Sequence, residues 1–533
     1  MKAIFLLLVL AVPVLAQERR GRPSPTEEAP ATPSREQTPE RSRTNETTRT
    51  QSQGSGGSTP IAEKVDETPV VTHHEITLHG KTLEYTATVA QMPILDASDE
   101  TEAHMFYVAY TLDEATNTPG RRPLAFAFNG GPGSPTIWLH MLAIGPRRAK
   151  LLDDGNMPRP PFTLVDNDDT LLEQCDLVFI DAVGTGYSRA KTVENARRFN
   201  GVNGDLQAFG EFIRMYLTRN NRWLSPLFII GESYGTFRAA GLAGNLIDQG
   251  IAFNGIVLVS TVLNFETLRP GLNNSLGYAL NLPTYAADAW YHKKLPADLQ
   301  AKELPVVLKE VEGWAMTGYL EALNQGDQIT AEERNEIVAK LARYNGLDAH
   351  YVEESNLRYG VGQFTRQLLR AEKLTIGRYD GRLTGPSPMN AGETSEFDPS
   401  GSLPQPPVEA AFMNYIRTEL NYKTDMKYYM SGGIVPWDWG ASNGFADTGN
   451  QLRNAFTKNP HLQVMVCASY YDLATPYFEA KYALNHLGVQ PEIQKRIHWA
   501  FYEAGHMMYI KRPTHDKFKQ DLTDFITQAM TAE

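Results

Sequence analysis

Cysteine is nearly absent from this chain. Only Cys175 and Cys467 occur among its 533 residues, which excludes a framework of disulfides. Each lies in or beside an apolar run typical of a strand. We therefore expect two buried free thiols, and a single bridge between them is the alternative.

The chain also lacks an excess of positive charge. Its 62 acidic side chains outnumber 50 basic ones and give a formal net charge of −12, which argues against a nucleic-acid partner. The apolar run Ala3–Leu15 is too short to span a bilayer comfortably. It follows Lys2 and leads into the small-residue site Val14-Leu15-Ala16, so residues 1–16 are predicted to be a signal peptide. No cysteine follows that site, so we expect no lipid anchor and no stable membrane insertion after cleavage, with the mature protein periplasmic or extracellular.

Large apolar residues are scarce between residues 17 and 66. Pro, Ser, Thr, Gln, Glu and Arg dominate there, and such a segment buries too little surface to offset its chain entropy. We expect a disordered linker over 17–66 and order from about Pro69.

Alternating strand-like and helix-like segments fill the rest of the chain. They predict an α/β fold with a mostly parallel central sheet, whose core is formed by residues 67–274 and 431–533, with a helical lid inserted at 275–430. Together with the serine motif described below, this pattern indicates an α/β-hydrolase fold. A half-buried antiparallel hairpin is predicted at His74–Val89. The further strands are predicted at Met105–Thr111, Pro123–Phe128, Asp176–Asp181, Leu227–Ile230, Gly255–Thr261, His461–Ser469 and Arg496–Phe501.

Metal and nucleotide motifs are weak. His73, His74 and His79 invite a zinc site, but His74 and His79 are five residues apart in a strand, whereas a zincin needs four on a helix. The loop Asn129–Ser134 lacks the G-K-[S/T] ending of a phosphate-binding loop, and Gly184-Thr185-Gly186 lacks a third glycine. We expect no metal and no cofactor.

The segment Pro226–Gly241, PLFIIGESYGTFRAAG, organises the chain. Its G-x-S-x-G motif stands between an apolar strand and a helix-compatible stretch, the setting of a nucleophile elbow. The tight turn needs residues without side chains two before and two after the serine, and Gly231 and Gly235 meet that need. Ser233 is therefore the candidate nucleophile, and a plain Gly-Ser turn is the alternative.

Two later strands are each followed by a residue that completes a triad. Asp472 follows His461–Ser469, and His506 follows Arg496–Phe501, which gives the α/β-hydrolase order Ser, Asp, His. His506 is expected to take the proton of Ser233, and Asp472 to orient the imidazole. A turn-capping role for Asp472 and a structural role for His506 are the alternatives. The backbone N–H groups of Gly131 and Tyr234 are expected to form the oxyanion hole.

The motifs FNGGPGS, DAVGTGYS, GESYG, YYDLATPY and AGHMM resemble, in sequence and in order, those of the serine carboxypeptidases. The scarcity of cysteine is similar to the bacterial branch of that family. The resemblance implies serine-type removal of residues from the free C-terminus of peptides. It also implies that Asn129, the Gly130 N–H and Glu232 bind the terminal carboxylate.

One departure from the family pattern concerns Glu232. The family usually pairs this acid with a second Glu two residues before a Gly-Pro, and here Ala143 stands at that position. Because paired acids raise each other's pKa, its loss is expected to shift the acidic optimum or to loosen carboxylate binding. Arg147 and Arg148 are possible cationic substitutes, although charged surface residues are the commoner explanation. An esterase or acyltransferase that uses the same triad is the alternative function, and an inactive binding protein is a third.

Overall fold

The structure, a computed structural model, describes residues 60–113, 122–434 and 436–531. The predicted signal peptide and most of the predicted linker lie outside these ranges. All described residues belong to one compact unit.

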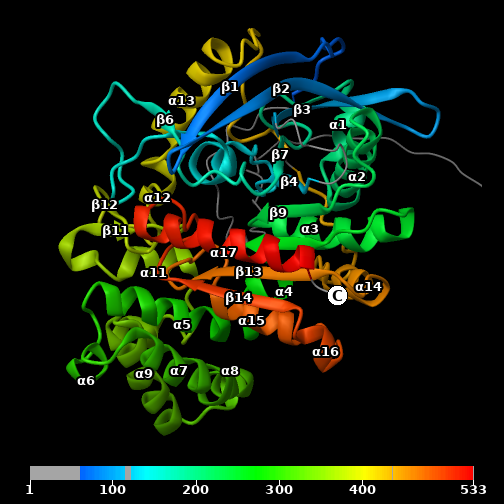
Figure 1. Cartoon of the computed structure of the whole chain (residues 1–533). Helices are drawn as coiled ribbons and strands as arrows, with labels where there is room; N and C mark the ends of the chain where they lie inside the picture. The colour runs from blue at the N-terminus through cyan, green and yellow to red at the C-terminus, as the bar shows by residue number, and fades with distance from the viewer. Residues whose placement is uncertain (1–59, 114–121, 435, 532–533) are drawn as a thin grey trace, which may run out of the picture. The chain divides into compact units, whose positions relative to one another are not determined.

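A sheet of ten strands forms the centre of this unit (Figure 1). The order is β1-β2-β3-β7-β4-β9-β10-β13-β14, with β8 paired to β3. The strands from β7 to β14 are parallel, and β1, β2 and β3 add an antiparallel end. In that order the strands are Val70–Leu78, Lys81–Leu95, Thr101–Leu112, Asp176–Ile180, Leu124–Phe128, Leu227–Glu232, Gly255–Val259, Gln463–Ser469 and Ile497–Tyr502, and β8 is Arg189–Ala190.

The predicted hairpin is confirmed as β1 paired with β2. Its two-residue turn is His79-Gly80, and both residues have positive φ, +50° and +83°. Positive φ at both central positions matches the right-handed twist of a hairpin, and glycine adopts it at no steric cost. This pair extends the antiparallel end of the sheet, far in strand order from the residues at β9, β13 and β14.

Each inner parallel strand is apolar on both faces because helices cover both. On one face Phe126, Ile229 and Leu258 pack with α2 (Val202–Arg219), α3 (Tyr234–Leu246) and α14 (Gly449–Lys458). On the other face the alternate residues, such as Ala127, Ile230 and Val257, pack with α17 (Arg512–Thr531) and the π-helix η1 (Leu139–Ile144). This parallel sheet between helix layers, with its connections, is the predicted α/β-hydrolase fold.

The two cysteines lie in the second of these clusters and are both buried and free, as predicted. Burial raises the pKa of the Cys175 thiol to about 12 and raises that of Cys467 as well.

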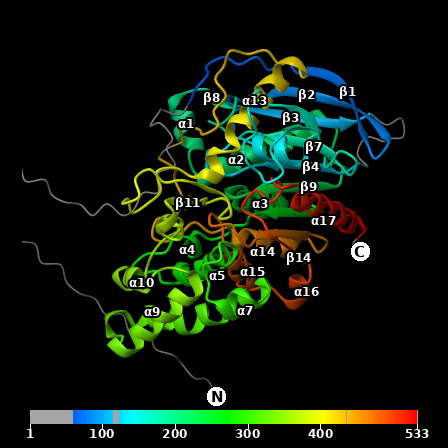
Figure 2. The same cartoon turned by 90° about the vertical axis from the view of Figure 1, so that its left-hand side faces the viewer.

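A second group of helices lies beyond the β14 end of the sheet in both views (Figures 1 and 2). Its apolar centre is formed by α5, α7 and α9 with their neighbours. A capping box begins α9, since Thr330 and Glu333 bond reciprocally. The helices of this region are α5 (Leu276–Tyr291), α6 (Ala297–Gln300), α7 (Leu304–Trp314), η3 (Ala315–Tyr319), α8 (Leu320–Gln325), η4 (Gly326–Gln328), α9 (Ala331–Asn345), α10 (Ala349–Glu354), α11 (Val361–Gln367) and η5 (Arg370–Glu372).

The segment 275–430 differs from the expected lid in its last part. A two-stranded sheet of β11 (Leu374–Ile376) and β12 (Thr384–Pro386) follows the helices. After α12 (Pro399–Ser402), α13 (Gln405–Thr418) buries Phe412 and Tyr415 in the same cluster as β1, β2 and β3, because its apolar face matches that side of the sheet. The remaining short elements are β5 (Arg147–Ala149), β6 (Leu164–Asp166), α1 (Val193–Phe199), η2 (Ile247–Gln249), α4 (Phe265–Leu268), α15 (Tyr477–Asn485) and α16 (Pro491–Gln494).

The N-terminal boundary also differs slightly from expectation. Residues 60–66 were assigned to the linker, yet the Ala62 N–H donates a hydrogen bond to the Ala190 carbonyl across 2.9 Å. Ile61 also forms a β-bridge with Ala190. The end of the expected linker is therefore attached to the edge strand β8.

Candidate active site

Ser233 lies in a sharp turn between β9 and α3. Its φ of +61° and ψ of −130° lie outside the regions that non-glycine residues usually adopt, which marks a strained backbone. A Cβ on Gly231 would lie 2.3 Å from the Gly235 carbonyl oxygen, and one on Gly235 would lie 2.9 Å from that of Phe128. Both glycines are thus sterically required, as the elbow motif predicts. The turn leaves Ser233 partly exposed at the carboxyl end of the strand.

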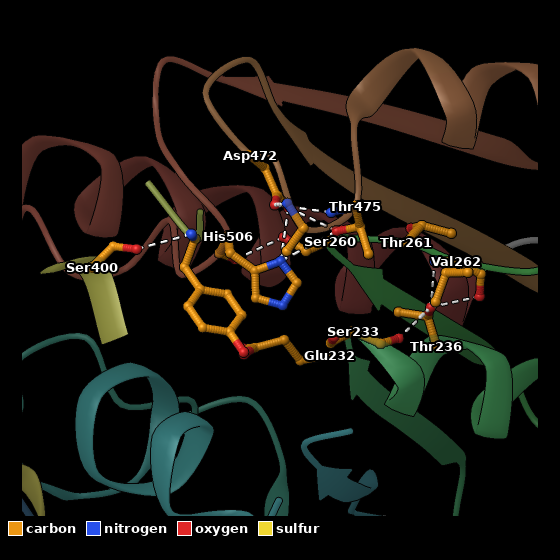
Figure 3. Close-up of polar contacts among 12 residues, drawn as sticks. Glu232, Ser233, Thr236, Ser260, Thr261, Val262, Ser400, Asp472, Thr475 and His506 are labelled. Atoms are coloured by element: carbon orange, nitrogen blue, oxygen red, sulfur yellow. Dashed lines mark hydrogen bonds and ion pairs between the residues drawn. The ribbon is translucent and has the colours of Figure 1, made fainter. Parts of the chain in front are cut away.

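Asp472 and His506 follow the neighbouring parallel strands β13 and β14. The His506 Nδ1 donates a hydrogen bond to Asp472 Oδ2 across 2.8 Å, and both side chains are buried. The opposite edge of the imidazole faces Ser233 (Figure 3). The structure therefore brings the three predicted residues together from positions 233, 472 and 506.

Asp472 is held by three further donors. Its Oδ1 accepts the N–H groups of Ala474 and Thr475 at 2.8 and 3.0 Å, and its Oδ2 accepts the Thr475 hydroxyl at 2.7 Å. Burial disfavours a charged His506, but the attraction of Asp472 and their hydrogen bond exceed this effect. The pKa of His506 is therefore raised. This environment suits an imidazole that accepts a proton during a reaction.

The loop after β4 touches the start of α3. A Cβ on Gly130 would lie 2.4 Å from the Tyr234 backbone nitrogen, so only glycine permits this approach. Gly131 follows with a φ of +103°. In the described part of the chain, no backbone hydrogen bond is recorded from the N–H of Gly131 or of Tyr234, the two predicted oxyanion donors. Two such donors near a nucleophile are what an oxyanion needs.

Glu232, adjacent to Ser233, is buried and accepts two hydrogen bonds. Asn129 Nδ2 donates to its Oε1 at 2.9 Å, and the Tyr509 hydroxyl donates to its Oε2 at 2.5 Å. Burial is the main effect on this carboxyl and raises its pKa to about 7. Glu232 is therefore largely protonated below neutral pH, and a neutral carboxylic acid can donate a hydrogen bond to a carboxylate.

Ala143 and the two arginines after Gly145-Pro146 form their hydrogen bonds with residues other than this acid. Ala143 is fully buried in η1, and its carbonyl accepts hydrogen bonds from Asn167 and His515. Arg147 pairs with Asp166 and Glu419, and Arg148 lies 3.2 Å from His515 Nδ1. These partners explain both arginines without a role at Glu232.

A loop that was not predicted from the sequence accepts hydrogen bonds from the backbone of His506 and of Leu473, the residue after Asp472. We call residues 378–382, between β11 and β12, the strap. The Arg378 carbonyl accepts the Leu473 N–H at 3.1 Å, and the Tyr379 carbonyl accepts the His506 N–H at 2.5 Å. A Cβ on Gly505 would lie 2.4 Å from the Tyr379 carbonyl oxygen, so the strap also explains the glycine before His506.

Other contributors to the site were missed because they are distant in sequence. Ser260 follows β10 and donates its hydroxyl to the His506 carbonyl at 2.7 Å (Figure 3). Tyr509 stands three residues after His506, and that proximity to a motif was the one available signal. Nothing in the sequence marks the strap.

Two further features of the described ranges concern metal ions and membranes. No group of three or more His, Cys, Asp or Glu residues there is placed to hold a metal ion. His73 and His79 are exposed on the hairpin, and His74 stacks on Tyr85. Among the described helices, none combines the length and the apolarity needed to cross a membrane.

Two plant proteins are similar in sequence to parts of this chain. Serine carboxypeptidase-like 51 from Arabidopsis thaliana is 32% identical over 154 residues, covering 28% of this chain and 30% of that protein. Serine carboxypeptidase-like 45 from the same plant is 24% identical over 220 residues, covering 37% of this chain and 44% of that protein. The matches thus span less than half the length of these relatives.

A solved proline iminopeptidase from Mycobacterium smegmatis aligns over 83% of this chain and 98% of its own, with 13% identity and a TM-score of 0.35. The family model described as serine carboxypeptidase matches residues 92–532, which include every candidate site residue named above. The chain belongs to the serine carboxypeptidase family.

Proposed function

We propose that this protein is a serine carboxypeptidase that releases C-terminal residues from peptides through an acyl-enzyme on Ser233. The observation that carries the proposal is the buried His506–Asp472 pair, 2.8 Å apart, facing a serine in a strained elbow. Ser233 attacks the scissile carbonyl while His506 takes its proton, and His506 then protonates the leaving amine. The N–H groups of Gly131 and Tyr234 stabilise the oxyanion, and each is worth roughly 10²–10³ in rate.

Recognition of the terminal carboxylate is assigned to Asn129, the Gly130 N–H and Glu232. The buried acid with its pKa raised to about 7 supports this role, since only its protonated form can donate to a carboxylate. The Tyr509 hydroxyl is a second hydrogen-bonding partner of Glu232, a role that the methyl group of Ala143 cannot fill. The exopeptidase preference for a free C-terminus follows from this group rather than from the triad.

The experiment compares one peptide as its free acid and as its C-terminal amide, followed by mass spectrometry, with Ser233→Ala as the control. Stepwise shortening of the free acid alone is expected. Equal cleavage of both forms would remove the assigned carboxylate recognition. If neither form is cleaved while Ser233 still reacts with a fluorophosphonate, the esterase or acyltransferase alternative, which Ala143 favours, takes its place. Absence of labelling would instead favour a binding protein.

The proposal also includes export of the protein from the cytoplasm. The layout of residues 1–16 supports export to the periplasm or the exterior, and N-terminal sequencing of the secreted protein tests cleavage after Ala16. The expected likeness to the bacterial branch has only the cysteine count behind it, and the Arabidopsis relatives do not support it.

A further inference from the structure

The Arg378 guanidinium and the imidazole of His506, the candidate general base, both contact the ring of Tyr379. Its central carbon is 5.2 Å from the centre of the Tyr379 ring, and that ring is 5.2 Å from the His506 imidazole. Arg378 and Tyr379 are both partly exposed. The strap thus carries a cation beside the triad, and solvent or a ligand can reach it.

The backbone of Arg378 is fixed although its charged group is not. Its N–H donates to Asp398 Oδ1 at 3.1 Å, and its carbonyl accepts the Leu473 N–H at 3.1 Å. Within the described residues, no hydrogen bond or ion pair is recorded for its guanidinium, which contacts the face of Tyr379. Arg382, four residues along the same strap, instead binds Asp380 at 2.6 and 2.8 Å.

A guanidinium that has no hydrogen bond or ion pair within the described residues, and whose backbone is held in place, is suited to bind an anionic ligand. Its planar array of N–H donors matches a carboxylate, and stacking on an aromatic ring limits the entropy lost on binding. The charges that act on His506 include Asp472, Glu232 when it is ionised, and the cation Arg378. Arg378 is therefore the group that would attract a negative charge to this side of the imidazole.

The reaction places one part of the substrate beside His506. Because His506 protonates the leaving amine, the residue being released lies against the imidazole. We propose that Arg378 binds a carboxylate of this leaving C-terminal residue, with Tyr379 holding the guanidinium in place. The inference rests on the proposed carboxypeptidase function and deepens it, because it names a specificity residue for that reaction.

Two carboxylates of the leaving residue are possible sources. The main-chain carboxylate is already assigned to Asn129, Gly130 and Glu232. A side-chain carboxylate, present when the C-terminal residue is Asp or Glu, is free to reach Arg378. The chemistry is the same for both sources, and peptide design separates them.

Binding is measured by calorimetry on the full chain carrying Ser233→Ala, which removes turnover. Four peptides share one sequence and end in Glu or Gln, each as free acid or amide. Adding Arg378→Gln is expected to weaken binding about tenfold, the loss of one charge-assisted hydrogen bond. A loss confined to the Glu peptides identifies the side-chain carboxylate as the source, and a loss confined to the free acids identifies the main-chain carboxylate.

Arg378→Lys keeps the charge and should lose less affinity than Arg378→Gln. Arg343→Gln is the matched control, because Arg343 of α9 pairs with Asp298 of α6, and this variant should leave all four affinities unchanged. The proposal is overturned if Arg378→Gln changes no affinity, if it weakens all four peptides by the same factor, or if none of the four binds. Cleavage by the enzyme with Ser233 intact is scored separately, so a failure of the proposed function is distinguishable.

Discussion

The Tyr509 hydroxyl donates a 2.5 Å hydrogen bond to Glu232, the acid that precedes the candidate nucleophile. The family pattern expects a second carboxyl near this acid, and Ala143 occupies its position. A phenol differs from a carboxyl as a partner, because it stays neutral and keeps its proton over the working pH range. It therefore stabilises the ionised form of Glu232, whereas a second carboxylate would oppose it.

Tyr509→Phe should extend carboxylate recognition to higher pH. The Tyr509 hydrogen bond lowers the pKa of Glu232, so its loss raises that pKa and keeps the acid protonated to higher pH. The pH at which KM for a free-acid peptide begins to rise should therefore move upward. Tyr482→Phe, on a partly exposed tyrosine that stacks on His486, is the control and should leave this limit unchanged. A downward shift in Tyr509→Phe would contradict the assignment.

The free-acid reaction should have two pH limits with different origins. Attack needs a neutral His506, so kcat/KM falls as the pH drops below the raised pKa of the imidazole. Binding needs a protonated Glu232, so kcat/KM also falls as the pH rises above about 7. Glu232→Gln removes the ionisation but keeps a donor, so it should abolish the upper limit. The lower limit should persist and move downward, because the Glu232 charge helps to raise the pKa of His506. Profiles of kcat/KM against pH for both enzymes measure this, and an upper limit that persists in Glu232→Gln would show that another group titrates.

Gly505→Ala should disturb the triad through the strap. The new methyl group would meet the Tyr379 carbonyl oxygen and the Asp380 Cβ, each at 2.4 Å, so the strap or His506 must move. A displacement of about 1 Å at a catalytic group can cost roughly 10²-fold in rate. We expect such a loss in kcat and slower fluorophosphonate labelling of Ser233.

Gly313→Ala is the matched control for that variant, since nothing lies within 4 Å of its new Cβ in α7. It should keep full activity and gain a little stability, because alanine favours a helix over glycine by about 1 kcal/mol. Equal kcat in Gly505→Ala and the wild type would mean that the strap does not position His506.

Ala143→Glu should destabilise the protein without restoring an acid pair. Ala143 is fully buried, and an unpaired buried carboxyl costs about 3 kcal/mol or more. Both oxygens of Glu232 already accept hydrogen bonds, from Asn129 and Tyr509. The melting temperature is expected to fall, as it should with the uncharged Ala143→Gln, while the pH limit of KM stays unchanged.

A change in that pH limit for Ala143→Glu but not for Ala143→Gln would revive the original hypothesis that the missing acid sets the optimum. The double variant with Tyr509→Phe gives the complementary test. There one Glu232 oxygen has lost its hydrogen-bond donor, so any effect of Glu at position 143 should be greatest in that background.

The residues that a local backbone geometry requires could be predicted from the amino-acid sequence. Gly231 and Gly235 are needed wherever a strand turns this sharply into a helix, so the motif alone located Ser233. Asp472 and His506 were predicted for a related reason, because each follows an apolar run whose parallel strands must end at the same edge of the sheet. Burial of Cys175 and Cys467 followed equally from their apolar neighbours.

Tertiary structure alone decided which distant side chains support these residues. The partner of Glu232 is Tyr509, 277 residues away, and the strap reaches His506 from a segment more than a hundred residues earlier. The position of α13 was decided in the same way, since an amphipathic helix shows which face is apolar but not which surface it covers. Local periodicity and motif spacing encode backbone geometry, whereas hydrogen bonds between loops depend on how the whole chain packs.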